Sequence, residues 1–299
     1  MIAAIHKCEN NSGPYCAAPV NIHRIDWMWA NKAVFDANGI SVPTTWDELN
    51  AAAEKLQAAG IIPFAHGGQA WQDATVFEAV AMGIGGNNYY KNCYVDLKES
   101  CLRSETTVKV FDQMRKLQGF TDEGSPGRDW NVATGMVIEG KAGFQIMGDW
   151  AKGEFTAAGK VPGVDYYCAA TPSNNGYLYN VDSFIFYKSS DPDKQAGQKL
   201  LAKLMMGKNF QKVFNLYKGS IPARLDVSMD EFDKCAKTSN ADIKTAGASG
   251  GLVPSFAHGM AQGNTMKAAL QDIITEHFNS DMSSVDAANA LADSVLANM

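Results

Sequence analysis

Two tryptophans, each directly after an aspartate, are the residues of this chain whose types and spacing most favour binding chemistry. Trp130 follows Asp129, and Trp150 follows Asp149 twenty residues later. An aromatic ring covers the weakly positive C–H face of a pyranose, while a neighbouring carboxylate accepts strong hydrogen bonds from the sugar hydroxyl groups. A lone tryptophan is more often part of a hydrophobic core. Both of these lie where a helix and a strand are expected to meet, which favours a sugar-facing role.

The same two aspartates suggest a second chemistry, the hydrolysis of a glycosidic bond. A glycoside hydrolase uses two carboxyl groups, one of which has a raised pKa and acts as the general acid. Nothing in the sequence sets the environments of Asp129 and Asp149 apart, and a carboxylate beside a tryptophan suits hydroxyl recognition. We therefore favour a binding protein without catalysis over a hydrolase.

The histidines raise a third possible function, a metal-binding protein that uses His23, His66 and His258. No HxH or HxxxH spacing places two of them on one element, and the five histidines are scattered along the chain. We therefore expect neither a metal site nor another cofactor.

The six cysteines predict disulfides and an oxidising compartment, because their number is even and they form no CxxC motif. Two pairs, Cys8 with Cys16 and Cys93 with Cys101, share a spacing of eight residues, and their pairing rests on that spacing alone. Zinc is the competing interpretation, but no two cysteines have the close spacing of a zinc knuckle. Some of the thiols could also be buried and free.

The composition is that of a folded protein with a large interior and an acidic surface. Hydrophobic residues make up 46% of the 299 residues, and a chain of this length more often forms two lobes than one. The net charge of −6 and the lack of a Lys/Arg run argue against nucleic acid as a partner. No stretch approaches the ~20 apolar residues that cross a bilayer. A neutral or cationic small ligand fits this composition better.

The elements that must position the two Asp-Trp pairs alternate between helix and strand, which predicts an α/β fold. Segment 142–147 is expected to be a buried strand that delivers Asp149 and Trp150 at its C-terminal end. Ligands of open α/β sheets bind outside the carboxyl ends of the strands. A short helix at 131–139 would follow Trp130 and end at Gly140.

The remaining elements follow from hydrophobic periodicity and from capping residues. The clearest helix starts with the capping box of Thr45 and Glu48 and ends at Gly60. A polar loop at 66–73 is rich in side chains of the kind that bind ligands. Further helices are expected at 75–82, 105–117, 192–217, 265–278 and 284–297, and strands at 61–65 and 183–187. The chain is expected to start with a hairpin that ends near Arg24 and whose second strand includes 17–22, and an apolar run follows at 27–30.

The N-terminal residues and the cysteines lead to different expectations about export. Residues 1–7 lack the basic start and the long apolar run of a secretory signal, whereas paired cysteines predict an exported protein. The two observations agree if the native start, with its export signal, is missing from this sequence. We therefore expect an N-terminally truncated chain.

Five motifs, in this order, resemble the family 1 extracellular solute-binding proteins of carbohydrate ABC importers. They are APVNIH at 18–23, PTTWDEL at 43–49, AHGGQ at 65–69, MGDW at 147–150 and KGSIPAR at 218–224. Each motif alone is weak, but the run of motifs from about Tyr15 to the C-terminus is specific. Within that family, the sequence is most similar to the periplasmic glucose- and mannose-type binding proteins of Gram-negative bacteria.

The resemblance implies an α/β fold of two lobes, the class II Venus-flytrap fold of periplasmic binding proteins. Such a protein would capture a mono- or disaccharide, glucose above all, in the periplasm and deliver it to the permease of an ABC importer. It would be a monomer with no enzymatic activity and no cofactor. A chemoreceptor-linked sugar sensor would use the same fold and site, so the sequence does not separate the two functions.

The resemblance also implies a set of ligand-binding residues. The matching positions are Trp130 and Trp150 for stacking on the sugar ring, and Asp182, Lys218, His258 and, more weakly, Asp26 for the sugar hydroxyl groups. Two alternatives stay open. Lys218 at a helix end would also complement the helix dipole, and His258 could be an ordinary loop histidine.

Two departures from the family pattern matter. Most of the N-terminal lobe is expected to be missing, which predicts an exposed apolar surface and weak sugar affinity. Cys168 with Cys235 resembles a disulfide of the family, whereas the other two cysteine pairs look like additions. The expected segments are 1–22 for the remnant of the N-terminal lobe and the first hinge strand, 23–165 for the first part of the C-terminal lobe, 166–176 for a hinge crossing, 177–222 for the return through the N-terminal lobe, and 223–299 for the hinge return and the last helices of the C-terminal lobe.

Overall fold

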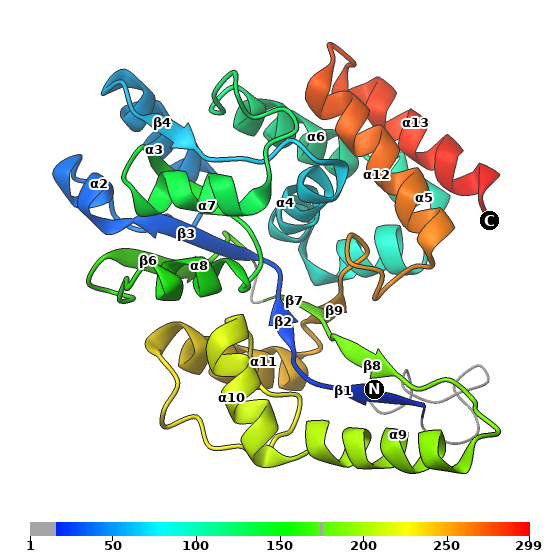
Figure 1. Ribbon diagram of the computed structural model, residues 1–299. Coiled ribbons are helices and arrows are strands. Elements are labelled where there is room, and N and C mark those ends of the chain that lie inside the picture. Colours follow the sequence, from blue (N-terminus) through cyan, green and yellow to red (C-terminus); the bar gives the residue numbers. More distant parts are fainter. Residues whose placement is uncertain (1–15, 174–175) are drawn as a thin grey trace.

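The computed structural model describes residues 16–173 and 176–299, which form a large and a small unit joined by a short sheet (Figure 1). The large unit is built around a four-stranded sheet with the order β4-β5-β3-β6. Its strands are β3 (Trp27–Asn31), β4 (Ile62–Phe64), β5 (Ala142–Ile146) and β6 (Tyr166–Ala170). β3 runs antiparallel to β5 and β6, whereas β4 runs parallel to β5. Every residue of β3 and β5 is buried, so the sheet lies inside the unit.

Helices pack on this sheet and form a helical layer beside it (Figure 1). In that layer α4, α6, α12 and α13 share one core, to which they contribute the buried side chains of Phe77, Phe111, Leu270 and Leu291. None of the helices in the described ranges combines the length and the apolar character that a membrane span requires. The helical segments of the large unit are α2 (Lys32–Ala37), α3 (Trp46–Ala58), α4 (Ala70–Tyr90), the π-helical turn η2 (Lys91–Val95), α5 (Glu99–Leu102), α6 (Glu105–Gln118), α7 (Trp130–Ile138), α8 (Ala151–Ala157), α12 (Asn264–Asn279) and α13 (Ser284–Ala297).

A three-stranded sheet with the order β2-β7-β9 connects the two units, and we call it the hinge sheet. Its strands are β2 (His23–Arg24), β7 (Tyr177–Asn180) and β9 (Leu252–Pro254). β7 runs antiparallel to β2 and parallel to β9. The described chain passes between the units at these strands, before β3, after β6 and before α12 (Figure 1). Residues 166–176, expected as a hinge crossing, comprise β6 of the large unit and the connection that leads to β7.

Among the described residues, the small unit comprises a two-stranded antiparallel sheet and three helices. Its sheet pairs β1 (Ala17–Pro19) with β8 (Ser183–Ile185). α9 (Pro192–Met205) packs on β1, α10 (Lys208–Lys218) packs on α9, and α11 (Lys234–Ser249) packs on β7 and β9. The expected strand at 183–187 is thus present, and the expected strand at 17–22 is shortened to β1. The other strand of the predicted hairpin lies outside the described residues.

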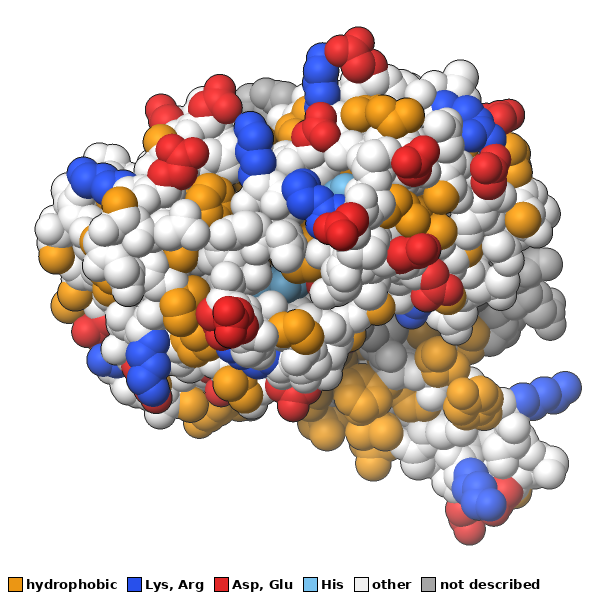
Figure 2. All heavy atoms as spheres, turned by 90° about the horizontal axis from the view of Figure 1, so that it is seen from above, with side chains coloured by type: hydrophobic (Ala, Val, Ile, Leu, Met, Phe, Trp, Pro, Cys, Tyr) orange, Lys and Arg blue, Asp and Glu red, His pale blue; other side chains and the backbone are white. Residues whose placement is uncertain are grey.

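Apolar side chains remain exposed on the small unit. Figure 2 shows hydrophobic side chains gathered where this unit projects beyond the large one. An apolar groove of about 670 Å³ runs between α9 and α10, and its lining includes Leu200, Leu204, Phe210, Val213 and Phe214. The side chain of Leu200 is 71% exposed. An exposed apolar surface is therefore present, as expected, while the absence of most of one lobe stays a prediction.

Several predicted elements differ from the observed ones in ways that local backbone geometry explains. The expected helix at 192–217 is two helices, because Gly207 has an extended conformation, with φ −72° and ψ 142°, and caps the start of α10. The helix expected at 75–82 begins earlier, at Ala70, and runs to Tyr90 across a break at Gly86, whose φ is 77°. The capping box is confirmed, since Thr45 Oγ1 accepts the backbone N–H of Glu48 at 3.1 Å.

Two of the predicted disulfides are confirmed. Cys93 bonds to Cys101 between η2 and α5, and Cys168 of β6 bonds to Cys235 of α11. The second bond ties the large unit to a helix of the small unit. The predicted partner of Cys16, Cys8, lies outside the described residues.

Candidate functional site

A cavity of about 880 Å³ lies where the hinge sheet meets the small unit. Its lining includes Asp182 at the start of β8, Lys218 at the end of α10, and His258 after β9. The side chains of Asp182 and Lys218 reach it from the small unit, and His258 from the segment that leads back to the large unit. The fold thus brings three of the predicted ligand residues to one cavity.

Trp150 adjoins this cavity through its contact with His258. The ring centroids of Trp150 and His258 are 5.0 Å apart, and the ring of His23 lies 5.2 Å from Trp150. A further ring, that of Trp71 near the start of α4, lies 6.4 Å from Trp150. Trp150 is only partly buried. An aromatic surface of the large unit is therefore next to the polar lining.

Two glycines allow this arrangement. A Cβ at Gly148 would lie 2.2 Å from a ring carbon of Trp150, so only glycine leaves the ring in its place. Gly219 has a φ of 92°, and a Cβ there would lie 2.4 Å from the carbonyl oxygen of Asp149. The end of α10, with Lys218, consequently packs directly against the segment that carries Asp149 and Trp150.

Asp182 belongs to a network centred on the buried His23. His23 Nε2 and Asn21 Nδ2 each lie 3.0 Å from Asp182 Oδ2. The other ring nitrogen, His23 Nδ1, is hydrogen-bonded to Asp149 Oδ1. Asp149 Oδ2 accepts the backbone N–H of Arg24 at 3.0 Å. The Asp182 side chain is 43% exposed, so the network ends at a carboxylate that solvent reaches.

The charges of this network shift two pKa values in opposite directions. Burial opposes a charge on His23, but the carboxylates of Asp149 and Asp182 outweigh it and raise the pKa of His23 to about 9. Burial also opposes a charge on Asp182, yet the hydrogen bond from His23 and its charge hold the pKa of Asp182 well below its usual value. At neutral pH, a protonated His23 therefore lies beside an ionised Asp182.

His258 is a neutral histidine whose Nδ1 is a hydrogen-bond acceptor. Thr75 Oγ1 donates its single hydrogen to the carbonyl of Trp71 at 2.7 Å. The contact of 3.0 Å between Thr75 Oγ1 and His258 Nε2 therefore requires the imidazole to donate. Burial, together with the charge of His23, lowers the pKa of His258 to about 3. The remaining nitrogen, Nδ1, is suited to accept a hydrogen bond from a ligand hydroxyl group.

The turn that carries His258 is held by the buried side chain of Glu78. Glu78 of α4 accepts hydrogen bonds from Ser255 Oγ at 2.7 Å, from Tyr90 Oη at 2.9 Å and from the backbone N–H of Phe256 at 3.1 Å. Burial raises the pKa of Glu78 to about 8. α4 thus fixes the segment that follows β9 and delivers His258 to the cavity.

Two predicted ligand residues lie elsewhere. Trp130 is the first residue of α7 and packs partly buried in the large unit. Neither Trp130 nor Trp150 is among the described lining residues, but Trp150 contacts His258 of that lining. Asp26 is fully buried, forms an ion pair with Arg24 and accepts the backbone N–H of Leu178 at 3.0 Å. A ligand could not reach the Asp26 carboxylate without disrupting these bonds. The sugar contact of Trp130 stays a prediction.

The positions of Asp129 and Asp149 do not support a hydrolase. Both carboxyl groups of such an enzyme must face the substrate. Asp149 is buried, and each of its oxygens is bound to a protein group. Asp129 is exposed and accepts a hydrogen bond from Gln69 Nε2 at 2.7 Å. Asp149 has a structural role beneath the cavity, and Asp129 orients Gln69.

Each of the three candidate metal-binding histidines has another partner. His66 pairs with Asp73, with 2.7 Å between Nε2 and Oδ1, while His23 binds two carboxylates and His258 binds Thr75. Within the described ranges, no group of three or more His, Cys, Asp or Glu side chains is arranged to hold a metal ion.

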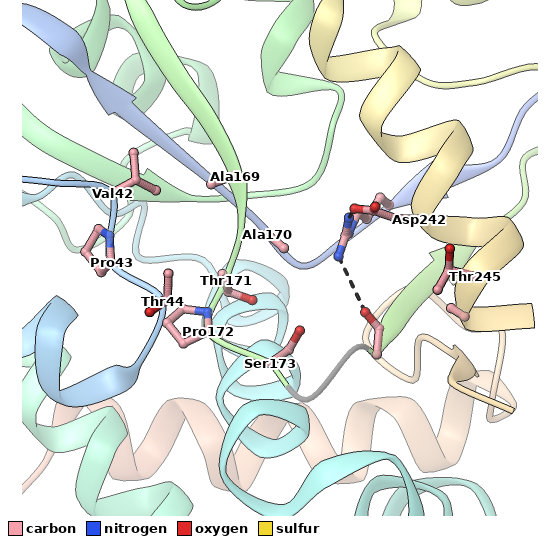
Figure 3. A pocket seen from close by; sticks show the side chains of 13 residues that line it. Val42, Pro43, Thr44, Ala169, Ala170, Thr171, Pro172, Ser173, Asp242 and Thr245 are labelled. Carbon is pink, nitrogen blue, oxygen red and sulfur yellow. Dashed lines mark hydrogen bonds and ion pairs between the residues drawn. The ribbon is translucent and has the colours of Figure 1, made fainter. Parts of the chain in front are cut away.

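A second cavity, of about 280 Å³, lies between the end of β6 and α11 (Figure 3). In this view the segment from Ala169 to Ser173 faces Asp242 and Thr245 of α11. The charged residues of its described lining are Arg24 and Asp242, which pair at 2.6 Å. Because these charges are paired and the predicted ligand residues line the other cavity, this one is a poorer match for a sugar.

Trp71, Asn21 and His23 take part in the site although the sequence does not assign them to it. The polar loop 66–73 is a signal that could have found Trp71. Asn21 and His23 lie in the APVNIH motif, but their partners are distant in the sequence: Asp182 is 161 residues after Asn21, and Asp149 is 126 residues after His23. No local pattern indicates such pairs.

The comparisons with known sequences agree with the motifs. The chain is 46% identical over 294 residues to a "probable sugar-binding periplasmic protein" of Brucella suis biovar 1 (strain 1330), which covers 98% of this chain and 69% of that protein. A protein of the same name from Rhizobium meliloti (strain 1021) is 44% identical over 294 residues, covering 98% of this chain and 70% of the relative.

Solved structures share the fold at low sequence identity. The bacterial solute receptor AcbH, described as exclusively preferring β-D-galactopyranose, has a TM-score of 0.84 at 18% identity, covering 99% of this chain and 75% of that one. The maltose-bound MalE3 of T. maritima has a TM-score of 0.76 at 19% identity, with the same coverage of 99% and 75%. These neighbours are two-lobed α/β binding proteins rather than enzymes. With residues 3–205 matching its profile, the chain belongs to the family of bacterial extracellular solute-binding proteins.

Proposed function

We propose that this protein binds a sugar in the periplasm and delivers it to the permease of an ABC importer. The Brucella and Rhizobium relatives, at 46% and 44% identity, support both the ligand class and the compartment through their names. The observation that carries the proposal is that Asp182, Lys218 and His258 line one cavity, while the ring of Trp150 contacts His258 beside it.

The chemistry of these groups suits a pyranose. Asp182 accepts hydrogen bonds with a full negative charge, Lys218 donates with a positive charge, and the neutral His258 offers an acceptor nitrogen. The ring of Trp150 supplies an apolar face for the C–H groups of the sugar. A set with both donors and acceptors matches the mixed character of sugar hydroxyl groups.

The size of the cavity is compatible with a small sugar. Its volume of about 880 Å³ falls within the range of about 300–1,000 Å³ that is usual for small-molecule sites. With the ring of Trp150 beside it and Asp182, Lys218 and His258 in its lining, the cavity suits a monosaccharide. We infer a glucose-type aldohexose as the ligand and a monomer as the binding form.

Capture would follow closure of the two units about the hinge sheet. Trp150 belongs to the large unit and Lys218 to the small one, so a sugar that contacts both stabilises the arrangement in which they are close. The closed form would be the one that the permease recognises.

Calorimetric titration tests the proposal. The oxidised protein would be titrated with D-glucose, D-galactose, D-mannose, D-xylose and maltose, together with the variants Trp150→Ala and Trp130→Ala. We expect saturable binding of an aldohexose by the wild type and binding more than about tenfold weaker for Trp150→Ala, because a buried aromatic contact contributes about 1.5–3 kcal/mol.

The Trp130→Ala variant is the matched comparison, since both tryptophans follow an aspartate and are partly exposed. Unchanged affinity in Trp130→Ala would assign the stacking to Trp150. Unchanged affinity in Trp150→Ala would remove that ring from the site, and no binding of any of the five sugars by the wild type would refute the proposed ligand class.

A further inference from the structure

His23 connects the two units at the cavity. It lies in β2, one of the crossing strands of the hinge sheet (Figure 1), and is buried. Its Nδ1 is hydrogen-bonded to Asp149, which follows β5 of the large unit. Its Nε2 lies 3.0 Å from Asp182, which precedes β8 of the small unit. One imidazole ring thus joins a carboxylate from each side of the hinge sheet.

With Asp149 and Asp182 both ionised, the geometry places a hydrogen on each ring nitrogen of His23. An ionised carboxylate only accepts hydrogen bonds, and a neutral imidazole has a single N–H group. Asn21 Nδ2 also lies 2.9 Å from His23 Nε2, but Asn21 Oδ1 accepts the backbone N–H of Asp182. Asn21 Nδ2 is therefore a donor as well, and it shares the acceptor Asp182 Oδ2 with the imidazolium.

These bonds leave one oxygen of Asp182 for a ligand. Oδ2 is occupied by His23 and Asn21. Oδ1 accepts a hydrogen bond from Asn180 Nδ2 at 3.0 Å and keeps a second lone pair. The Asp182 side chain lines the cavity and is 43% exposed, so solvent does not fix its orientation. The direction in which Oδ1 faces a ligand therefore depends on the groups that hold Oδ2.

We propose that His23 is a positioning residue of the sugar site, which fixes the Asp182 carboxylate for the ligand and couples it to Asp149 across the hinge. The inference rests on the proposed sugar-binding function and extends it to a residue that does not touch the sugar. Loss of the imidazolium would free Asp182 to rotate and would remove a contact between the two units. Sugar affinity would then fall while the other ligand groups stay in place.

The charge of His23 makes this role dependent on pH. Its pKa of about 9 lies above the ordinary value of 6.5. The stabilising interaction of protonated His23 with Asp149 and Asp182 is therefore fully present below about pH 6.5 and is lost as the pH rises through 9. The charged and titratable groups that face His23 or its partners are Asp149 after β5, Asp182 before β8, Lys218 of α10, His258 after β9, Arg24 of β2, Asp26 before β3 and Tyr177 of β7.

Nitrogen NMR of the histidine side chains tests the coupling without a ligand. The wild type has five histidines, and the spectrum of His23→Gln identifies the signal of His23. We expect both nitrogens of His23 to be protonated at about pH 7.5 and the midpoint to fall by about one pH unit or more in Asp182→Asn. A neutral His23 at that pH, or an unchanged midpoint in Asp182→Asn, would overturn the proposal.

Sugar titration at two pH values tests the positioning role. For D-glucose, or for whichever sugar of the panel binds the wild type most tightly, we expect His23→Gln to raise Kd at least about tenfold. Wild-type affinity should fall between about pH 7 and about pH 10, whereas the affinity of His23→Gln should change much less over that range. Equal affinities, or equal pH profiles, of wild type and His23→Gln would contradict the role.

The matched control is His66→Gln. His66 is another buried histidine paired with a carboxylate, but its partner Asp73 is buried and is not among the described lining residues of the cavity, whereas Asp182 is. His66→Gln should lower thermal stability and leave Kd within about twofold of the wild type. If the wild type binds no sugar, the proposed function fails, while the NMR titration still decides whether His23 couples Asp182 to Asp149.

Discussion

At the scale of single residues, Gly148 determines where the ring of Trp150 lies. A Cβ at this position would be 2.2 Å from the Trp150 ring, which is closer than any real contact. In Gly148→Ala the ring must move, and it would lose its edge contacts with His258 and His23. We expect sugar affinity to fall about tenfold, which corresponds to about 1.4 kcal/mol of binding free energy. Calorimetric titration measures this loss.

Gly135→Ala is the control for that prediction. Gly135 lies inside α7, and a Cβ there would meet no atom within 4 Å. Alanine at a helical position of this kind stabilises the fold or leaves it unchanged. If Gly148→Ala bound sugar as tightly as Gly135→Ala, the position of the Trp150 ring would not matter for the ligand.

At the scale of elements, α4 supports the turn that carries His258 through Glu78. Replacing Glu78 by alanine leaves the hydroxyl group of Ser255 without its acceptor, and it leaves the backbone N–H of Phe256 and the hydroxyl group of Tyr90 with only their longer bonds of 3.2 Å to Tyr90 Oη and to the carbonyl of Pro254. We expect Glu78→Ala to lower the free energy of unfolding by about 3 kcal/mol, because unsatisfied buried donors are costly. Urea denaturation measures this change, and sugar titration should show weaker binding as the turn loosens.

Glu105→Ala is the comparison for this prediction. Glu105 is also a helical glutamate, but it is exposed at the start of α6 and pairs with Lys109 on the surface. Surface ion pairs of this type contribute little to stability. Equal denaturation midpoints for the two variants would show that Glu78 does not hold the turn.

The elements that the sequence predicts well are those with local signals. α3 is found because its capping box and its terminal glycine act within a few residues of the helix. α11 is not found, since its sequence has few large apolar side chains and its position depends on the bond between Cys235 and the distant Cys168. The separation of α9 from α10 depends on one residue, Gly207, and hydrophobic periodicity does not reveal a break at a single residue.

At the scale of the whole molecule, the site likewise combines residues that the sequence indicates with a geometry that depends on distant contacts. Trp150 and Lys218 lie in family motifs, Asp182 and His258 are implied by the family resemblance, and the fold brings the four residues close together. Their geometry is set by contacts over long sequence distances, such as the 159 residues between His23 and Asp182. The predicted roles of Asp26 and Trp130 come from the family resemblance and, for Trp130, from the preceding Asp129; neither carries information on whether a side chain points into a cavity.

The apolar groove between α9 and α10 predicts a surface property of the whole molecule. Leu200 and Leu204 are 71% and 60% exposed and line the groove together with Phe210, so a hydrophobic dye should bind there. We expect the double substitution of Leu200 and Leu204 by lysine to reduce the dye fluorescence by about half or more, because charges interrupt the apolar surface.

Leu225→Lys separates the groove from exposed leucines in general. Leu225 is 90% exposed but is not among the described residues that line the groove, so its replacement should leave the dye signal unchanged. A single exposed apolar side chain is common on protein surfaces and binds a dye poorly, whereas a continuous apolar lining binds it well. Equal dye fluorescence for the wild type, the double variant and Leu225→Lys would show that the dye does not bind in the groove.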